Sequence, residues 1–119
     1  MDTIITIAEK RVPLRKTGGT ALRYKRQFGR EFLADLQKIL ALRSRLTPDT
    51  TQDEKAEIVL STETEWMYDI IYIMAQQADS SITDELEWLD SFDDFNIWTA
   101  FDQILPLLIA ESKVSPKNA

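Results

Sequence analysis

Carboxylates, hydroxyls, lysines and arginines are the side chains through which this chain could do chemistry, because it contains neither histidine nor cysteine. Without His there is no imidazole to transfer protons or to bind a metal near neutral pH. Without Cys there is no thiolate nucleophile, disulfide, zinc finger or iron–sulfur cluster. These two absences exclude most familiar enzyme classes before any motif is considered.

The segments that look like catalytic or ligand-binding motifs are incomplete. Lys16-Thr17-Gly18 matches one triplet of penicillin-binding proteins, but the Ser-x-x-Lys that accompanies it is absent. Gly18-Gly19 lacks the adjacent Lys-Ser/Thr of a phosphate-binding loop. The acidic pairs Asp84-Glu85 and Asp93-Asp94 lack the spacing of a calcium loop and stand where acids favour the start of a helix. We therefore predict that the chain is not an enzyme and has no cofactor or metal.

The size and composition of the chain fit one folded domain. It has 119 residues, of which 44% are apolar and 29% charged, which is enough for a hydrophobic core without covalent cross-links. The N-terminus is acidic where a signal peptide carries positive charge. The apolar runs are far shorter than the ~20 residues that cross a bilayer. We therefore expect an intracellular protein with no membrane partner.

Charge is divided unequally along the chain. Residues 1–46 hold eleven Lys/Arg and four Asp/Glu, whereas residues 47–111 hold one Lys and sixteen Asp/Glu. We consider three explanations, in order of preference. The basic half can lie against the acidic half within one fold, the basic face can meet the acidic face of another copy or a protein partner, or the basic half can bind nucleic acid.

The first part of the chain predicts a β-hairpin followed by two helices. Residues 3–7 are β-branched and favour a strand, which a turn at 8–10 connects to a second strand at 11–15. Pro13 cannot donate a ladder hydrogen bond, so this second strand is expected at a sheet edge. Helical spacing then begins, with a left-handed cap expected at Gly29 and a second helix directly after it.

The acidic part of the chain predicts three more helices after a polar loop at residues 46–51. The first starts at a Thr62/Glu65 capping box and is apolar on nearly all sides, so we place it at the centre of the core. A short helix is capped near Asp84. The last starts at Asp93-Asp94 and is kinked, or begins its final turn, at Pro106.

The predicted fold is mainly α: a small bundle of about five helices with a short N-terminal β-hairpin. We expect a single domain over residues 1–111, followed by a flexible tail at 112–119.

Two groups of residues are candidates for binding a partner. Basic residues interleave with aromatic ones in residues 20–30, which is compatible with self-assembly, a partner, or a small DNA-binding regulator. We expect Tyr24 and Phe28 to face the core instead of stacking on bases. This basic face consists of Arg23, Lys25, Arg26 and Arg30.

Large aromatic side chains in the acidic half form the second group. Tryptophan is enriched at binding hot spots, and an exposed one would mark a seat for a partner's amphipathic helix. The competing interpretation is that these rings simply fill the core. The candidates are Trp66, Trp88, Trp98 and Phe101.

The order of these segments resembles the tail assembly chaperones of long-tailed phages and prophages of Gram-positive bacteria. A β-rich start leads into residues 18–36, followed by the apolar helix at 66–78, Leu-Glu-Trp-Leu-Asp-Ser-Phe at 86–92, and a helix containing Ile-Leu-Pro-Leu-Leu. The resemblance spans about residues 3–110. It rests mainly on the order and spacing of apolar positions.

The resemblance implies a binding protein of the bacterial cytoplasm. Family members bind the long, helical, apolar tape measure protein and keep it soluble until tail tube protein polymerises around it. Some form homo-oligomers, and many are also made as a longer, frameshifted form; Pro116-Lys117-Asn118 can be encoded by a slippery heptamer. The expected partners are therefore the tape measure protein, the tail tube protein, the longer form and other copies of the chain. The alternatives are the DNA-binding regulator, for which nucleic acid is a less favoured partner, and an acidic helical inhibitor or adaptor.

Overall fold

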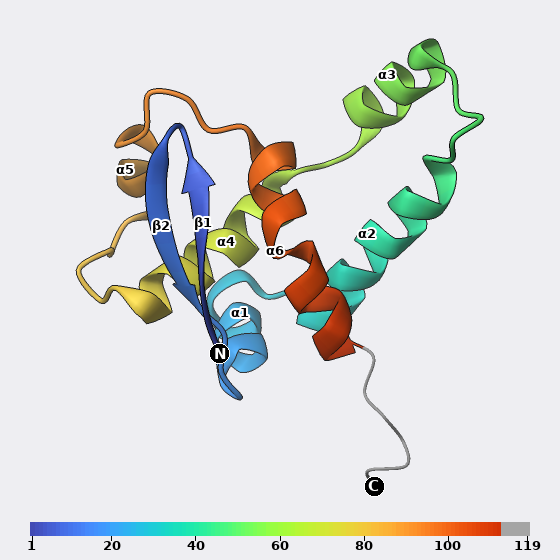
Figure 1. The fold of residues 1–119 in the computed structure, drawn as a ribbon. Coiled ribbons are helices and arrows are strands. Elements are labelled where there is room, and N and C mark those ends of the chain that lie inside the picture. The colour runs from blue at the N-terminus through green and yellow to red at the C-terminus, as the bar shows by residue number, and fades with distance from the viewer. Residues whose placement is uncertain (113–119) are drawn as a thin grey trace, which may run out of the picture.

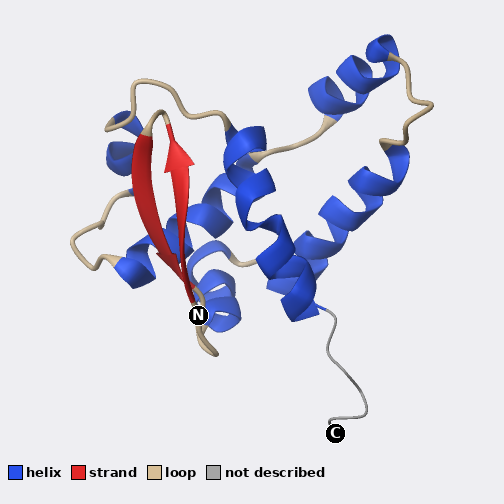
Figure 2. Ribbon diagram, in the orientation of Figure 1, coloured by secondary structure: helices blue, strands red, loops and turns tan. Residues whose placement is uncertain are grey.

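The computed structural model describes the backbone of residues 1–112 and the side chains as far as Leu108. Within this part of the chain, an antiparallel hairpin is followed by six helices (Figures 1 and 2). The elements are β1 (Asp2–Ile7), β2 (Lys10–Arg15), α1 (Thr20–Phe28), α2 (Phe32–Arg45), α3 (Gln52–Ser61), α4 (Glu65–Ala78), α5 (Glu85–Asp90) and α6 (Ile97–Ser112). The predicted fold class, a small helical bundle with an N-terminal hairpin, is confirmed.

Helix α4 forms the centre of the core, as its apolar pattern predicted. Nine of its fourteen residues are buried, and β2, α1 and α6 all pack against it. Ile70 and Ile71 are fully enclosed. A helix with apolar residues around its whole circumference must be covered on most sides, and three different elements provide that cover here.

The hairpin packs its inner face on the helices. Ile5 and Ile7 of β1, and Val12 and Leu14 of β2, are buried, and Ile5 pairs with Val12 in the antiparallel register. A two-residue turn, in which Ala8 and Glu9 both have positive φ, joins the strands. This is the backbone of the tight turns whose twist suits a hairpin.

Gln103 of α6 is hydrogen-bonded to the outer edge of β1. The Thr6 backbone N–H donates to Gln103 Oε1 at 2.8 Å, and Gln103 Nε2 donates to the Thr6 carbonyl at 2.8 Å. The side-chain amide thus satisfies the donor and acceptor that a third strand would otherwise use. Pro13 lies in the other strand, paired with Ile4; this agrees with the predicted edge position.

Helices α1 and α2 are joined at Gly29, which has φ of 74° and caps α1 in the predicted left-handed conformation. Tyr24 is buried and Phe28 packs partly against the core, as predicted. On α2, Leu36 and Ile39 are buried as well. Leu33 is 57% exposed and does not belong to the buried stripe of this helix.

The main error in the predicted elements concerns residues 51–65. Helix α3 was missed, and the capping box predicted for α4 at Thr62 and Glu65 does not form. Thr51 accepts a hydrogen bond from the Glu54 N–H while Glu54 accepts one from the Thr51 N–H, so a capping box starts α3. The Thr62 hydroxyl instead donates to the Ile58 carbonyl at the end of α3, and α4 starts after Thr64 without a side-chain cap.

The last helix starts later than predicted. It also continues further beyond Pro106 than predicted. Asn96 Oδ1 accepts hydrogen bonds from the Trp98 and Thr99 N–H groups, so α6 begins at Ile97 and not at Asp93-Asp94. It continues through Pro106 to Ser112. The predicted flexible tail at 112–119 therefore begins on a helical residue, and residues 113–119 lie outside the described part.

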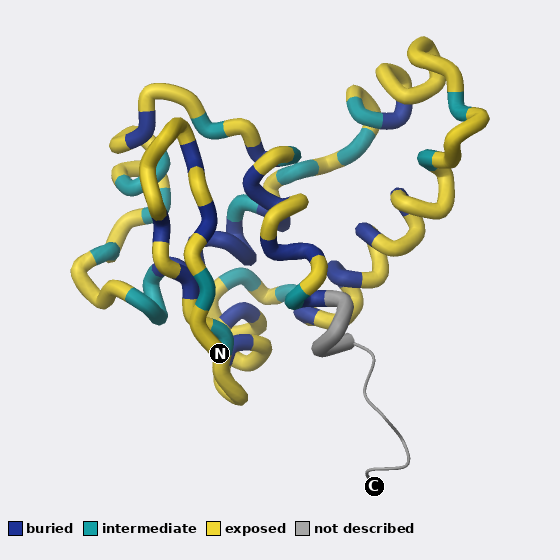
Figure 3. The backbone as a smooth tube through the Cα atoms, in the orientation of Figure 1, coloured by how far each residue is buried: buried dark blue, intermediate teal, exposed yellow. Residues whose placement is uncertain are grey.

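The end of α2 and the whole of α3 project from the rest of the molecule (Figure 1). We call residues 43–61 the arm, and the remaining described elements the body. Figure 3 shows that the arm is exposed along most of its length, and Ile58 is its one residue classed as buried. Among the described residues, α3 makes no extensive contact with another helix or strand.

Candidate functional site

Trp66 is not available to a partner, which corrects its assignment as a binding residue. Its side chain is 4% exposed, and Nε1 donates to the Glu63 carbonyl at 3.0 Å. Its ring stands edge-on to Phe101, with 5.6 Å between centroids. Phe101 is itself 1% exposed. The competing interpretation, that these rings fill the core, holds for both Trp66 and Phe101.

Trp88 belongs to α5 and lies in a separate aromatic cluster. Its ring is 5.4 Å from that of Phe92, 5.8 Å from that of Phe95 and 6.1 Å from that of Tyr72, centroid to centroid. It is partly buried against the core. The structure therefore does not bring the three tryptophans together, and a single seat formed by all of them is wrong.

Trp98 and Phe101 do line one groove, between α2 and α6. The groove has a volume of about 320 Å³. Its lining is mostly apolar, with a cation from α2 and an acid from α6: Ile39, Leu42, Arg43, Leu46, Met67, Trp98, Phe101, Asp102 and Leu105. Trp98 is the partly exposed tryptophan of this groove. The arm begins at one end of the same surface, because Arg43 and Leu46 belong to both.

Arg30 is part of an internal ionic network, which corrects its assignment to the basic face. Its guanidinium donates to Asp35 Oδ2 at 3.2 Å, to the Tyr24 hydroxyl, and to Asp69 Oδ2. Asp35 and Asp69 are 2% and 3% exposed. Arg30 thus joins the start of α2 to α4, and links the basic half of the chain to the acidic half.

Hydrogen bonds and burial together set the pKa values of Asp35, Arg30 and Tyr24 in this network. The Tyr24 hydroxyl donates to Asp35 Oδ2 at 2.6 Å, and Lys38 Nζ lies 2.7 Å from Asp35 Oδ1. Burial would raise the pKa of Asp35, but the hydrogen bonds from Lys38 and Tyr24 outweigh it and lower that pKa. Burial would likewise lower the pKa of Arg30, but hydrogen bonds to Asp69 and Tyr24 raise it. The burial of Tyr24, and its bond to Asp35, raise the pKa of the phenol.

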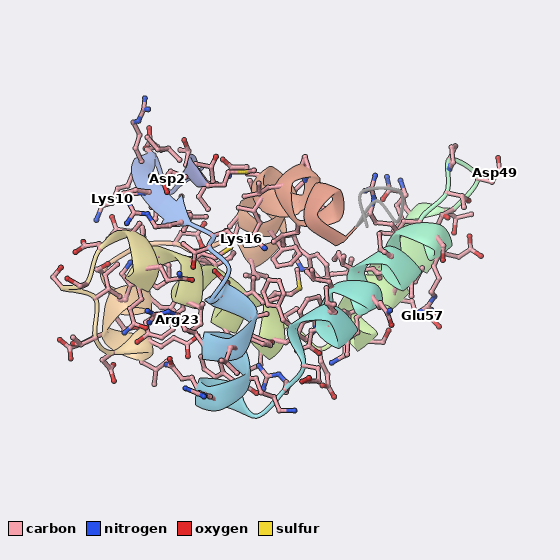
Figure 4. The ribbon with its side chains drawn as sticks, turned by 90° about the horizontal axis from the view of Figure 1, so that it is seen from below. Asp2, Lys10, Lys16, Arg23, Asp49 and Glu57 are labelled. Carbon is pink, nitrogen blue, oxygen red and sulfur yellow. The ribbon has the colours of Figure 1, made fainter. Side chains whose placement is uncertain are left out.

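The other predicted basic residues remain at the surface of α1. Lys25 Nζ is 2.9 Å from Glu31 Oε2 in an exposed ion pair, whereas Arg23 and Arg26 line a hollow with Gly19, Leu22, Gln27, Ile73 and Gln76. Neither arginine forms an ion pair with another described side chain. The basic face is therefore smaller than predicted, with Arg23 and Arg26 as its unpaired cations (Arg23 is labelled in Figure 4).

An acidic pocket between α4 and α5 was not predicted. Its volume is about 530 Å³, and its lining combines carboxylates with apolar side chains: Thr64, Glu65, Tyr68, Asp69, Glu85, Leu86, Leu89, Asp90 and Phe95. Burial, then a hydrogen bond with Asp69 and the charges of Asp69 and Glu65, raise the pKa of Glu85 to about 8. Its Oε2 is buried with no donor among the described residues. A proton held on Glu85 at neutral pH supplies the missing donor for the Asp69–Glu85 contact.

Sequence reasoning missed the buried acids because it read the apolar stripes alone. Asp69 interrupts an otherwise apolar helix, and Asp35 adjoins the apolar stripe of α2. An acid at a core position requires a cation or a donor nearby, and this was the available signal for a buried ion pair. No comparable signal in the sequence pairs Glu85 with Asp69, because their contact depends on how α5 folds back on α4.

No helix of the described part combines the length and the apolar character needed to span a membrane. In residues 1–112, the carboxylates are not grouped in a way that could hold a metal ion. Comparison of the chain with protein-family models, with curated proteins and with solved structures gave no match.

Proposed function

We propose that this chain is a tail assembly chaperone of a long-tailed phage or prophage, which binds the tape measure protein in the bacterial cytoplasm until the tail tube polymerises around it. The resemblance in residue order supports the family. The groove between α2 and α6 supports the mode of binding. We place the client seat there, in place of the seat of three tryptophans that the sequence predicted.

The groove is the observation that carries the proposal. Its floor is apolar, with Leu42, Phe101 and Leu105 among its residues, and Trp98 is partly exposed at its side. An amphipathic client helix presents an apolar stripe with charged residues at both edges. Arg43 on the α2 side and Asp102 on the α6 side offer opposite charges to those edges, which would favour one orientation of the client.

The arm gives the groove a second wall that can adjust to its client. Because α3 has little tertiary contact, the arm can shift relative to the body at small cost in free energy. A client with many successive helical segments of differing sequence requires a seat of this kind. We therefore assign the fixed part of the seat to α6 and to the buried Ile39 and Leu42 of α2. The adaptable part is where the arm begins, at Arg43 and Leu46.

Co-expression with the tape measure protein tests the proposal. Trp98→Ala should reduce the amount of soluble tape measure protein that co-purifies with the chain by at least ~10-fold, because large buried aromatic groups dominate binding energy. Trp88→Ala is the matched control, since it removes an equally large, partly buried indole from outside the groove. Full retention by Trp98→Ala, or equal loss in both variants, would contradict the groove as the client seat.

A further inference from the structure

The acidic pocket between α4 and α5 has apolar walls as well as carboxylates. Tyr68 and Phe95 line it with their rings 5.5 Å apart, centroid to centroid, and both side chains are only partly buried. Leu89 also belongs to the apolar part of the lining, and Leu86 is 71% exposed. The volume of about 530 Å³ is large enough for a small ligand or for one long side chain of a partner.

Every charged side chain in the lining of this pocket is an acid. Glu65 and Asp69 come from α4, and Glu85 and Asp90 come from α5. Asp69 already has a cation, Arg30, but the other three acids form no ion pair with a described side chain. The pocket therefore attracts a cation, and it repels phosphate groups and acidic peptides.

One carboxyl oxygen of the pocket is buried without a donor. Glu85 Oε2 receives no hydrogen bond from the described part of the chain. Burial, then the hydrogen bond with Asp69 and the charges of Asp69 and Glu65, raise the pKa of Glu85 to about 8, against a smaller opposite effect of Arg30. A cation with N–H donors beside this oxygen would satisfy it, and the carboxyl group would then release its proton to the solvent.

The acids and the rings together favour a guanidinium group over an ammonium group. A guanidinium is planar and carries five N–H donors that point in several directions, so it can reach carboxyl groups on both helices. Its flat face can also stack on an aromatic ring such as that of Tyr68 or Phe95. An ammonium group is a compact point charge with three donors and has no face to stack.

We propose that this pocket binds an arginine side chain of a partner polypeptide, with the guanidinium between the carboxyl groups of α4 and α5 and the stem against Tyr68 and Phe95. A polypeptide fits better than a free guanidine, because residues next to the arginine would cover Leu86, which a small cation would leave exposed. No residue of this pocket lines the groove between α2 and α6. The site is therefore separate from the client seat and does not depend on the proposed function.

Isothermal titration calorimetry with capped pentapeptides tests the pocket. The probe has arginine at its centre and leucine on both sides. Citrulline in place of the arginine removes the charge while nearly keeping the shape, and should weaken binding by at least ~10-fold. Lysine should also bind more weakly than arginine. Free agmatine should bind at least ~10-fold more weakly than the arginine peptide, because it cannot cover Leu86.

Variants of the chain locate the site of binding. Glu85→Gln removes the charge of the buried carboxyl group and should weaken binding of the arginine peptide by at least ~10-fold. Leu86→Ala changes an exposed residue, so it should keep the fold, and should weaken binding by ~3-fold or more. Glu87→Gln is the matched control, because it changes an exposed acid of α5 outside the pocket. Neither Glu87→Gln nor Trp98→Ala in the groove should change the affinity.

Proton release distinguishes a contact with Glu85 from a general attraction between charges. Titrations at pH 7 in buffers of different ionisation enthalpy should show ~1 proton released per peptide bound to the wild type, and none with Glu85→Gln. The wild-type affinity should rise from pH 6 to pH 8, because the proton on Glu85 competes with the guanidinium. The charged groups that face Glu85 are Asp69 and Glu65 of α4, and Arg30.

Four outcomes would overturn the arginine pocket. The first three are equal affinity for the arginine and citrulline peptides, equal affinity in Glu85→Gln and Glu87→Gln, and binding without proton release. The fourth is agmatine that binds as tightly as the arginine peptide, which would exclude a polypeptide as the source of the guanidinium.

Discussion

Helix α4 in the body and helix α3 in the arm have different sources of stability. α4 has nine buried residues and no side-chain cap at its N-terminus, whereas α3 has one buried residue and a complete capping box. Short isolated helices are marginal in water, so one with few tertiary contacts depends strongly on its own terminus. A helix enclosed by the core does not, because its packing supplies the free energy. The comparison shows where the molecule is rigid and where it can adapt.

Removing Arg30 should have the largest effect on the body. Arg30→Met leaves two buried carboxylates, Asp35 and Asp69, without their shared cation, and should lower the free energy of unfolding by about 3–5 kcal/mol. Urea denaturation measures this difference. Arg26→Met is the control on exposed α1, where we expect a change within about 0.5 kcal/mol. Equal effects in the two variants would show that the network does not stabilise the body.

An isoleucine in each helix compares the two regions directly. Ile70→Ala opens a cavity in a fully enclosed part of α4 and should cost about 2–5 kcal/mol of global stability. Ile58→Ala removes the one residue of the arm that is classed as buried, and should cost about 1 kcal/mol, because the surroundings can relax. Amide hydrogen exchange should speed up throughout the body for Ile70→Ala, and in α3 alone for Ile58→Ala. Body-wide loss of protection in Ile58→Ala would mean that the arm and the body unfold together.

Alkaline pH should act on the body through Glu85. Its pKa rises from 4.5 to about 8 on folding, so the folded state holds a proton that the unfolded state has lost. This contribution to stability is complete below pH 4.5 and disappears as the pH rises to about 8. The charged groups around Glu85 are Asp69 and Glu65 of α4, and Arg30.

Glu85→Gln should therefore flatten the fall of thermal stability between pH 5 and 8, because its amide donates to Asp69 without titrating. Glu87→Gln, on the exposed side of the same helix, should retain the wild-type slope. A Glu85→Gln profile that superimposes on that of the wild type would rule out the shared proton.

Loss of the α3 cap should have the smallest effect on stability, and this effect should be confined to the arm. Thr51→Ala removes the side-chain acceptor of the Glu54 N–H, which is one half of the capping box, and should cost about 1 kcal/mol. Amide hydrogen exchange should become faster in α3 and stay unchanged in the body, which would show that the loss of stability is local. Thr64→Ala is the matched control, because Thr64 stands at the N-cap of α4 without capping it through its side chain. A similar effect from Thr64→Ala would weaken the contrast between the two helices.

The sequence predicts the body better than the arm, for a physical reason. The all-round apolar pattern of α4, the β-branched first strand and Gly29 each favour one arrangement, so those elements were predicted correctly. Helix α3 has no strong apolar stripe, since Ile58 alone is buried, and periodicity therefore could not reveal it. Its actual signal was Thr51 three residues before Glu54, and the similar spacing of Thr62 and Glu65 gave the wrong start for the next helix.

The candidate site could be predicted only in part. Size identified the partly exposed Trp98 as a binding candidate, but the same argument included Trp66 and Phe101, which the core encloses. Charge identified Arg23 and Arg26, but also Arg30, which two distant acids bind instead. Composition tells which side chains can contact a partner; burial depends on which residues from other elements arrive beside them, and local spacing does not contain that information.

The bond between Thr6 and Gln103 also has a consequence for how the protein is made. The two residues are 97 positions apart, so the first strand leaves the ribosome long before the amide that closes its edge. Until then the nascent hairpin has an open edge and an uncovered apolar face. We infer that the N-terminus docks late in synthesis, and that ribosome-bound chains stalled before α6 should keep β1 accessible to proteases.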